Sequence, residues 1–98
     1  MKTNSTEITE INQKELKNVL DKENATIVDV RETSEFKDFN IGGINIPAHL
    51  LNEHLDELRE FDTLIVACSN GARSYILAKI IQKKLPQKNV LHLTEGVF

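Results

Sequence analysis

The fold of this 98-residue chain is decided by one stretch, TLIVACSNGARSYILAKIIQKKL, which covers residues 63–85. Residues 63–67 are apolar or β-branched and carry no charge, a composition typical of a strand that is covered on both faces. Ser69-Asn70-Gly71 interrupts the strand, and residues 72–85 then favour a helix that Pro86 ends. We expect this helix to face the core with Ile76, Leu77, Ile80 and Ile81. The stretch therefore predicts a central strand followed directly by a helix.

Shorter patterns on either side repeat the alternation of strand and helix. Asn12 and Glu15 form the pattern of a capping box, which indicates a helix start. The expected strands are residues 8–11, 26–30, 44–46, 63–67 and 90–93, and the expected helical segments are residues 13–22, 32–38, 72–85 and the Leu51, Leu55 and Leu58 repeat within 50–60. This alternation at short spacing indicates an α/β domain. We therefore predict a central, mostly parallel five-stranded sheet with helices on both faces.

Length and composition describe a single domain over residues 1–98, with a polar tail expected at residues 1–7. Twelve basic against fifteen acidic residues give a formal net charge of −3, which argues against binding to nucleic acids or anionic membranes. The sequence has no apolar stretch of about 18 residues, the length needed to span a bilayer. Its opening is polar and acidic where a secretory signal would be basic and then apolar, so we expect a cytoplasmic protein.

Cys68, the single cysteine of the chain, stands at the carboxyl end of the predicted central strand, where parallel sheets place their binding sites. A loop folded back over Cys68 can aim N–H groups at its sulfur, because the first N–H groups of a helix lack partners within the helix. With the helix dipole and the charge of Arg73, these donors are expected to lower the thiol pKa. Gly71 fits such a loop, since glycine tolerates a positive φ. We therefore expect a reactive thiolate.

The loop CSNGARS, residues 68–74, resembles the active-site loop of rhodanese-like domains, which are sulfurtransferases that carry a persulfide on one cysteine. Three further segments match the family in order: Asp29-Val30-Arg31-Glu32 with Glu35-Phe36, then Asn45-Ile46-Pro47, then Leu93-Thr94-Glu95-Gly96-Val97. The chain departs from the family in two ways. Phe39-Asn40-Ile41 stands where Gly-His-Ile is common, and the family's C-terminal helix is expected to be absent because the sequence stops at Phe98.

The resemblance implies a rhodanese-like fold and a sulfurtransferase that works by double displacement. Cys68 is the catalytic residue, which takes a sulfane sulfur from thiosulfate or another persulfide donor and passes it to a thiophilic acceptor. The substrate-binding residues that the loop implies are Ser69, Asn70, Gly71, Ala72, Arg73 and Ser74. The expected partners are a small anionic sulfur donor or a protein persulfide, and a thiol or cyanide as acceptor. No cofactor or metal is implied.

Two other functions remain open. Cysteine phosphatases and related arsenate reductases have five residues between cysteine and arginine, enough to surround a tetrahedral phosphate, whereas four residues separate Cys68 from Arg73. The shorter loop favours one extra sulfur atom over a phosphoryl group. A non-catalytic binding or regulatory module is the other alternative, and the presence of Cys68 counts against it.

The remaining polar candidates are expected to have structural roles. Asp29 and Arg31 are expected to frame the fold through an ion pair or through backbone hydrogen bonds, and we group Glu35 with them. His49, His54 and His92 have no carboxylate or second cysteine at ligand spacing in the sequence. We therefore expect no metal site at these histidines.

Overall fold

The computed structural model describes residues 8–22 and 24–98, so the tail expected at residues 1–7 lies outside the described residues. Five strands form one sheet in the order β1-β5-β4-β2-β3, and every pairing between them is parallel. The strands are β1 (Thr9–Ile11), β2 (Ala25–Asp29), β3 (Ile44–Asn45), β4 (Thr63–Ala67) and β5 (Asn89–Leu93). The predicted α/β class and five-stranded sheet are confirmed.

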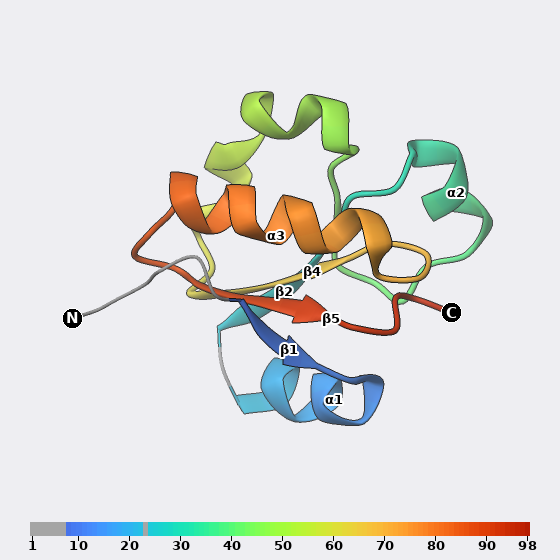
Figure 1. Ribbon diagram of the computed structural model, residues 1–98, viewed down its shortest axis with the longest axis horizontal. Helices are drawn as coiled ribbons and strands as arrows, with labels where there is room; N and C mark the ends of the chain where they lie inside the picture. The colour runs from blue at the N-terminus through green and yellow to red at the C-terminus, as the bar shows by residue number, and fades with distance from the viewer. Residues whose placement is uncertain (1–7, 23) are drawn as a thin grey trace.

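Helices cover both faces of this sheet (Figure 1). The α-helices are α1 (Gln13–Lys22), α2 (Thr33–Asp38) and α3 (Ala72–Lys84), and two 3₁₀-helices, η1 (Ala48–Glu53) and η2 (Leu55–Leu58), lie between β3 and β4 in the chain. Figure 1 shows α1 on one face of the sheet and α3 with the 3₁₀-helices on the other. In the described part of the chain, no helix is both long and apolar enough to cross a membrane.

The central position of β4 follows from its composition, because all five of its side chains are buried. Alternate side chains of a strand point to opposite faces. Leu64 and Val66 pack in the core beneath α3 and the 3₁₀-helices, whereas Ile65 and Ala67 pack in the core that faces α1. Burying a large aliphatic side chain contributes about 1.5–3 kcal/mol of transfer free energy. The strand that carries Cys68 at its carboxyl end is therefore held from both faces.

The capping box at the start of α1 is confirmed. The N–H of Asn12 donates to Glu15 Oε1 at 2.9 Å, and the N–H of Glu15 donates to Asn12 Oδ1 at 2.9 Å. Each side chain thus accepts a hydrogen bond from a backbone N–H group at the start of the helix. The adjacent Gln13 side chain donates to the carbonyl of Gly96 at 2.8 Å, which joins the start of α1 to the chain after β5.

The helix expected around the leucine repeat is instead a pair of 3₁₀-helices. The N–H of His54 donates to the carbonyl of Leu51, a contact over three residues, and the backbone of His54 leaves the helical region at φ −122° between η1 and η2. Leu51 and Leu58 are nevertheless buried as expected. Spacings of three and four residues bring side chains to one side in both helix types, so the repeat does not distinguish them.

The core face of α3 differs from the expected one. Its buried residues are Ser74, Ala78 and Ile81, with Leu77 partly buried, whereas Ile76 is 60% exposed and Ile80 is 37% exposed. Two residues along an α-helix correspond to a rotation of about 200°. Ile76 therefore lies on the side opposite Ser74 and Ala78, and a helix in the outer layer of a sheet domain buries only one side. The prediction was right for Leu77 and Ile81 and wrong for Ile76 and Ile80.

Candidate active site

Cys68 is the first residue after β4, and the loop that leads into α3 encloses its sulfur. The N–H groups of Gly71 and Ser74 donate to Cys68 Sγ at 3.2 and 3.3 Å. The residue is fully buried, so the sulfur sits beneath the loop. Because β4 is central and α3 begins at Ala72, the sulfur lies at a carboxyl strand end and at a helix N-terminus together.

Gly71 allows the loop to curl around the sulfur. Its φ is +93°, in the left-handed region that favours glycine, and a Cβ atom at this position would collide with the carbonyl of Thr94. The loop is also fixed from the other side, because the N–H of Val97 donates to the carbonyl of Cys68 at 2.9 Å. The segment that follows β5 therefore helps to hold the N–H groups in place around Sγ.

The loop lowers the pKa of the Cys68 thiol from its ordinary value. Burial by itself raises this pKa, because it disfavours the charged thiolate. Hydrogen bonds from the Ser74 hydroxyl and from the N–H groups of Ser74, Asn70 and Gly71 stabilise the anion and outweigh the effect of burial. The site thus favours a thiolate without a base in direct contact with the sulfur.

The other loop residues stabilise the loop itself. Asn70 Oδ1 accepts the N–H of Ala72 at 3.0 Å, so this N–H of the first helical turn is occupied. The Ser69 hydroxyl accepts from Arg73 Nη2 at 3.2 Å. Of the loop residues expected to bind substrate, Asn70, Gly71 and Ser74 donate their N–H groups to the sulfur. The Ser69 hydroxyl and the Ala72 N–H instead make contacts with Arg73 and Asn70.

Arg73 lies between the loop and α2. Its Nη1 and Nη2 atoms lie 3.4 and 3.3 Å from the two carboxylate oxygens of Glu35. The hydrogen bond to Glu35 is the main cause of a raised Arg73 pKa, and the Cys68 anion adds a smaller contribution. Besides the framing role expected of Glu35, the structure places its carboxylate against the arginine of the loop. The N–H of Glu32 also donates to Glu35 at 2.9 Å, which fixes the carboxylate at the start of α2.

The expected ion pair between Asp29 and Arg31 is confirmed. Arg31 Nη2 lies 2.8 Å from Asp29 Oδ2, Arg31 Nε lies 3.0 Å from Asp29 Oδ1, and both side chains are at most 1% exposed. Asn45 donates to the carbonyls of Asp29 and Arg31 at 3.0 Å. The pair and Asn45 therefore join the end of β2 to β3, at the carboxyl ends of the strands, where Cys68 also lies.

Sequence reasoning missed a contact chain behind the loop. Ser74 Oγ lies 2.7 Å from His92 Nε2, and His92 Nδ1 lies 2.7 Å from Glu10 Oε1. Glu10 and His92 are 82 residues apart in the sequence but opposite each other in the pairing of β1 with β5. Only the strand order could have revealed this contact, because no local spacing joins the two residues. Within residues 8–22 and 24–98, no group of three His, Cys, Asp or Glu side chains could hold a metal ion.

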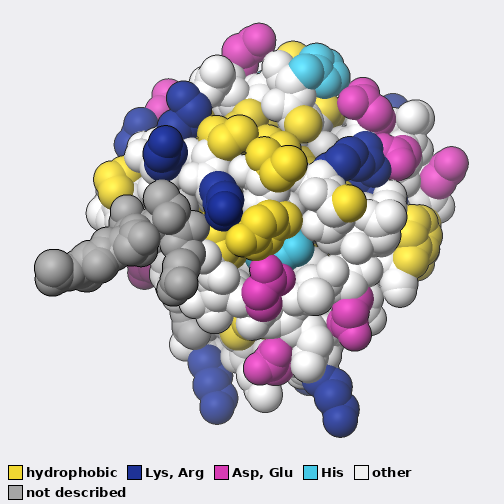
Figure 2. All heavy atoms as spheres, in the orientation of Figure 1, with side chains coloured by type: hydrophobic (Ala, Val, Ile, Leu, Met, Phe, Trp, Pro, Cys, Tyr) yellow, Lys and Arg dark blue, Asp and Glu magenta, His cyan; other side chains and the backbone are white. Residues whose placement is uncertain are grey.

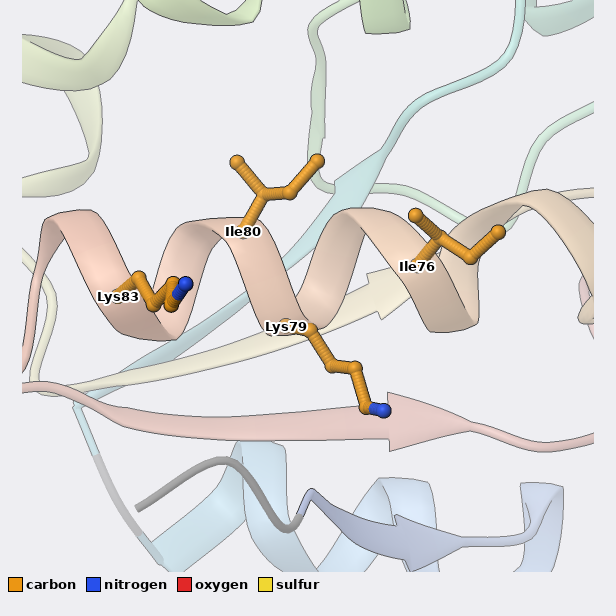
Figure 3. Close-up of a pocket in the computed structure, with 4 residues that line it drawn as sticks. All are labelled: Ile76, Lys79, Ile80 and Lys83. Carbon is orange, nitrogen blue, oxygen red and sulfur yellow. The ribbon is translucent and has the colours of Figure 1, made fainter.

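A surface hollow lies on α3, away from the sulfur. It is lined by Ile76, Lys79, Ile80 and Lys83, whose side chains extend from the helix in Figure 3. Figure 2 shows hydrophobic side chains gathered on this face of the molecule with basic side chains beside them. The hollow is distinct from the enclosure of Cys68, which the loop and Ser74 form on the buried side of the helix.

Comparison with known proteins places this geometry in a family. The family model of the rhodanese-like domain matches residues 12–98 of the chain. The chain is 32% identical over 96 residues to a Bacillus subtilis protein named "Putative sulfur carrier protein YrkF", covering 96% of this chain and 51% of the relative. The chain thus spans about half the length of this curated relative.

Solved structures give the same result for the fold. The NAD-dependent persulfide reductase from A. fulgidus is 32% identical with a TM-score of 0.66, and the match covers 91% of this chain and 15% of that one. The thiosulfate sulfurtransferase from Pseudomonas aeruginosa has a TM-score of 0.80 over 96% of this chain and 18% of its own, at 16% identity, which shows the fold alone. With a family match over residues 12–98 and Cys68 enclosed by the loop before α3, the chain belongs to the rhodanese-like domain family.

Proposed function

We propose that the protein is a sulfurtransferase that carries a sulfane sulfur as a persulfide on Cys68. The observation that carries the proposal is the pair of N–H donors, from Gly71 and Ser74, within 3.3 Å of Sγ. These donors lower the thiol pKa despite burial, and the same donors suit the charge of a persulfide. The family, and the name of the relative as a sulfur carrier, support this proposal.

The reaction is a double displacement. The Cys68 thiolate attacks the outer sulfur of the donor, a bond from Sγ to that sulfur forms, and the donor S–S bond breaks. With thiosulfate, sulfite leaves with the electron pair, and Cys68 becomes a persulfide anion. The acceptor then attacks the outer sulfur, and the Cys68 thiolate leaves with the electron pair of the broken bond. Cyanide becomes thiocyanate and a thiolate becomes a persulfide, so the enzyme is unchanged.

The site favours persulfide donors over thiosulfate. Arg73 carries the positive charge of the loop, and this charge is already paired with Glu35. The Glu35 carboxylate therefore weakens the attraction of Arg73 for a dianion such as thiosulfate. A low-molecular-weight or protein persulfide depends less on the positive charge of Arg73. A free thiolate that exchanges sulfur also suits a reducing compartment, so we place the reaction in the cytoplasm.

The geometry supports sulfur transfer better than phosphoryl transfer. Only four residues separate Cys68 from Arg73, and the N–H of Ala72 is occupied by Asn70 Oδ1 at 3.0 Å. An oxyanion with several peripheral oxygens needs more free donors than this loop offers. A phosphatase of this fold would instead hydrolyse an aryl phosphate, and a binding module would do neither reaction.

Intact mass spectrometry tests the proposal. The protein and its Cys68→Ser variant are incubated with thiosulfate or with a low-molecular-weight persulfide and then with cyanide. We expect the unmodified chain to gain the mass of one sulfur atom, to lose it to cyanide, and to load faster from the persulfide. The variant should gain nothing. A folded protein that gains no sulfur from either donor would refute the proposal of a sulfurtransferase. Hydrolysis of an aryl phosphate would show that the protein is a phosphatase instead.

A further inference from the structure

Three elements bring a carboxylate, an imidazole and a hydroxyl into one line behind the sulfur. Glu10 comes from β1, His92 from β5 and Ser74 from α3. The Glu10 side chain is 43% exposed, whereas the residues His92 and Ser74 are 3% and 0% exposed, so the line runs from the surface into the core. Its two hydrogen bonds are each 2.7 Å, and Ser74 then donates its own N–H to Cys68 Sγ at 3.3 Å.

The orientation of each proton in this line follows from the donor and acceptor capacity of its members. Burial alone raises the Glu10 pKa, but hydrogen bonds from His92 and Thr94 lower it overall, so Glu10 stays an ionised acceptor at neutral pH. The proton between Glu10 and His92 therefore belongs to His92 Nδ1. A neutral His92 then has only a lone pair at Nε2, and the single hydroxyl proton of Ser74 must point at it. A charged His92 donates from Nε2 instead, which frees the Ser74 proton for the sulfur.

We propose that His92, held by Glu10, is a positioning residue that acts through Ser74 and couples the charge on the Cys68 sulfur to the protonation of the imidazole. This inference rests on the proposed function for its biological use but not for its geometry. It adds a residue pair outside the loop, Glu10 and His92, to the set that controls the nucleophile. The hydroxyl of Ser74 also lies 3.4 Å from the carbonyl of Gly71, a longer contact than the one to His92.

The coupled step conserves one proton. The Ser74 hydroxyl is itself hydrogen-bonded to the Cys68 sulfur. In the proposed step, the S–H bond of Cys68 breaks as its proton passes to Ser74 Oγ, and the original Ser74 proton passes to His92 Nε2. The products are a thiolate, a Ser74 hydroxyl that points at Sγ, and an imidazolium whose charge the Glu10 carboxylate balances. No oxidant or further reactant is needed. The thiolate is thus formed with a nearby positive charge that a lone cysteine in a loop would lack.

Other charged groups near His92 define what a test must keep constant. On the α3 side, the Tyr75 ring lies edge-on at 5.6 Å from the imidazole, and Lys79 Nζ lies 5.0 Å from the Tyr75 ring. On the β1 side, Glu10 is the carboxylate, with Thr94 as its second donor at 2.8 Å. The Cys68 thiolate is a further charge, and it raises the pKa values of Arg31 and Arg73. Variants should therefore change His92 or Glu10 alone.

The test is the thiolate absorbance of Cys68 followed against pH, with the matching Cys68→Ser chain subtracted as a blank. His92→Gln keeps polar contact with Ser74 but cannot take up a proton. We expect it to shift the thiol titration to higher pH by up to about one unit, which lowers the thiolate fraction about tenfold below the midpoint. Glu10→Gln, at the half-exposed end, should shift it in the same direction by less. His54→Gln is the matched control, since His54 pairs with Glu57 at the exposed surface, and it should shift nothing.

A double variant separates coupling from a merely structural effect. In a Ser74→Ala background the bridge is absent, so His92→Gln should lose most of its effect on the thiol titration. Unchanged titrations in both folded His92→Gln and Glu10→Gln would overturn the proposal, as would a full His92→Gln effect without Ser74. If His92→Gln does not fold, Glu10→Gln decides alone. A chain that shows the shift but never loads sulfur would refute the proposed function and leave the coupling standing.

Discussion

Two arginine–carboxylate pairs flank the loop of Cys68, and they differ in burial. The pair of Asp29 and Arg31 is at most 1% exposed, and Asn45 is hydrogen-bonded to its backbone. The pair of Glu35 and Arg73 is 37% and 47% exposed, and its contacts are longer, at 3.3 and 3.4 Å. The buried pair of Asp29 and Arg31 thus frames the sheet, whereas the exposed pair of Glu35 and Arg73 adjusts the charge beside the sulfur. Burial decides which role a pair has, because solvent screens the exposed pair and not the buried one.

The largest effect is expected from breaking the buried pair. Arg31→Met leaves the Asp29 charge buried without a partner, so we expect the free energy of unfolding to fall by about 3–5 kcal/mol. Urea denaturation measures this loss. Arg73→Met is the matched variant at the exposed pair, and it should change the stability far less. Equal losses in the two variants would contradict the division between a framing and an adjusting pair.

The exposed pair should instead affect the chemistry. Arg73→Met removes the positive charge beside the sulfur while leaving the N–H groups of Gly71 and Ser74 in place. We expect sulfur loading from thiosulfate to slow about tenfold, which corresponds to about 1.4 kcal/mol of transition-state stabilisation. Mass spectra of samples quenched at successive times give the loading rate. An unchanged loading rate in the folded variant would show that Arg73 takes no part in sulfur transfer.

Releasing Arg73 from its partner should have the opposite sign. Glu35→Gln keeps an acceptor for the N–H of Glu32 but removes the negative charge from the pair. The arginine is then free for an anionic donor, so loading from thiosulfate should rise about two- to threefold at low salt and the gain should shrink as salt screens the charge. The persulfide donor serves as the internal control, because it depends less on this charge. Slower loading from thiosulfate would show that Glu35 assists the reaction rather than restraining Arg73.

The smallest effect is a dependence of stability on pH. The hydrogen bonds from Glu32 and Arg73 hold the pKa of Glu35 below its usual range. A carboxyl group with a lowered pKa in the folded state stabilises the fold above its unfolded pKa and loses that contribution as the pH falls through the folded value. The stability difference between the wild type and Glu35→Gln should therefore be constant from neutral pH to about 5 and shrink below about 4. A difference that grows on acidification would contradict the assignment.

The sequence allowed most of the fold to be predicted, because the chain has clear local signals. The uncharged residues of β4 and the capping box of Asn12 and Glu15 predicted their elements correctly. The leucine repeat failed because its spacing suits two helix types. The prediction that Ile76 and Ile80 face the core was wrong, because α3 has more apolar residues than one buried side can hold. The sequence does not indicate which side of the helix packs against the sheet.

The site was predictable only where it is continuous in sequence. Residues 68–74 place the sulfur, the N–H donors and Arg73 in one loop, so they could be read together. Glu35 and Glu10 reach this region through the packing of α2 and the pairing of β1 with β5, which no local pattern encodes. What the sequence did not reveal is therefore the contact of Glu35 with Arg73 and the contact of Glu10 with His92.

The most direct test of the account is the pKa of the Cys68 thiol in the unmodified chain. It is read from the thiolate absorbance during a pH titration, with the Cys68→Ser variant subtracted. We predict a midpoint below that of an ordinary thiol, because the loop donors outweigh burial. A midpoint at or above that value would mean that burial prevails, and the loop would then not prepare Cys68 to carry sulfur.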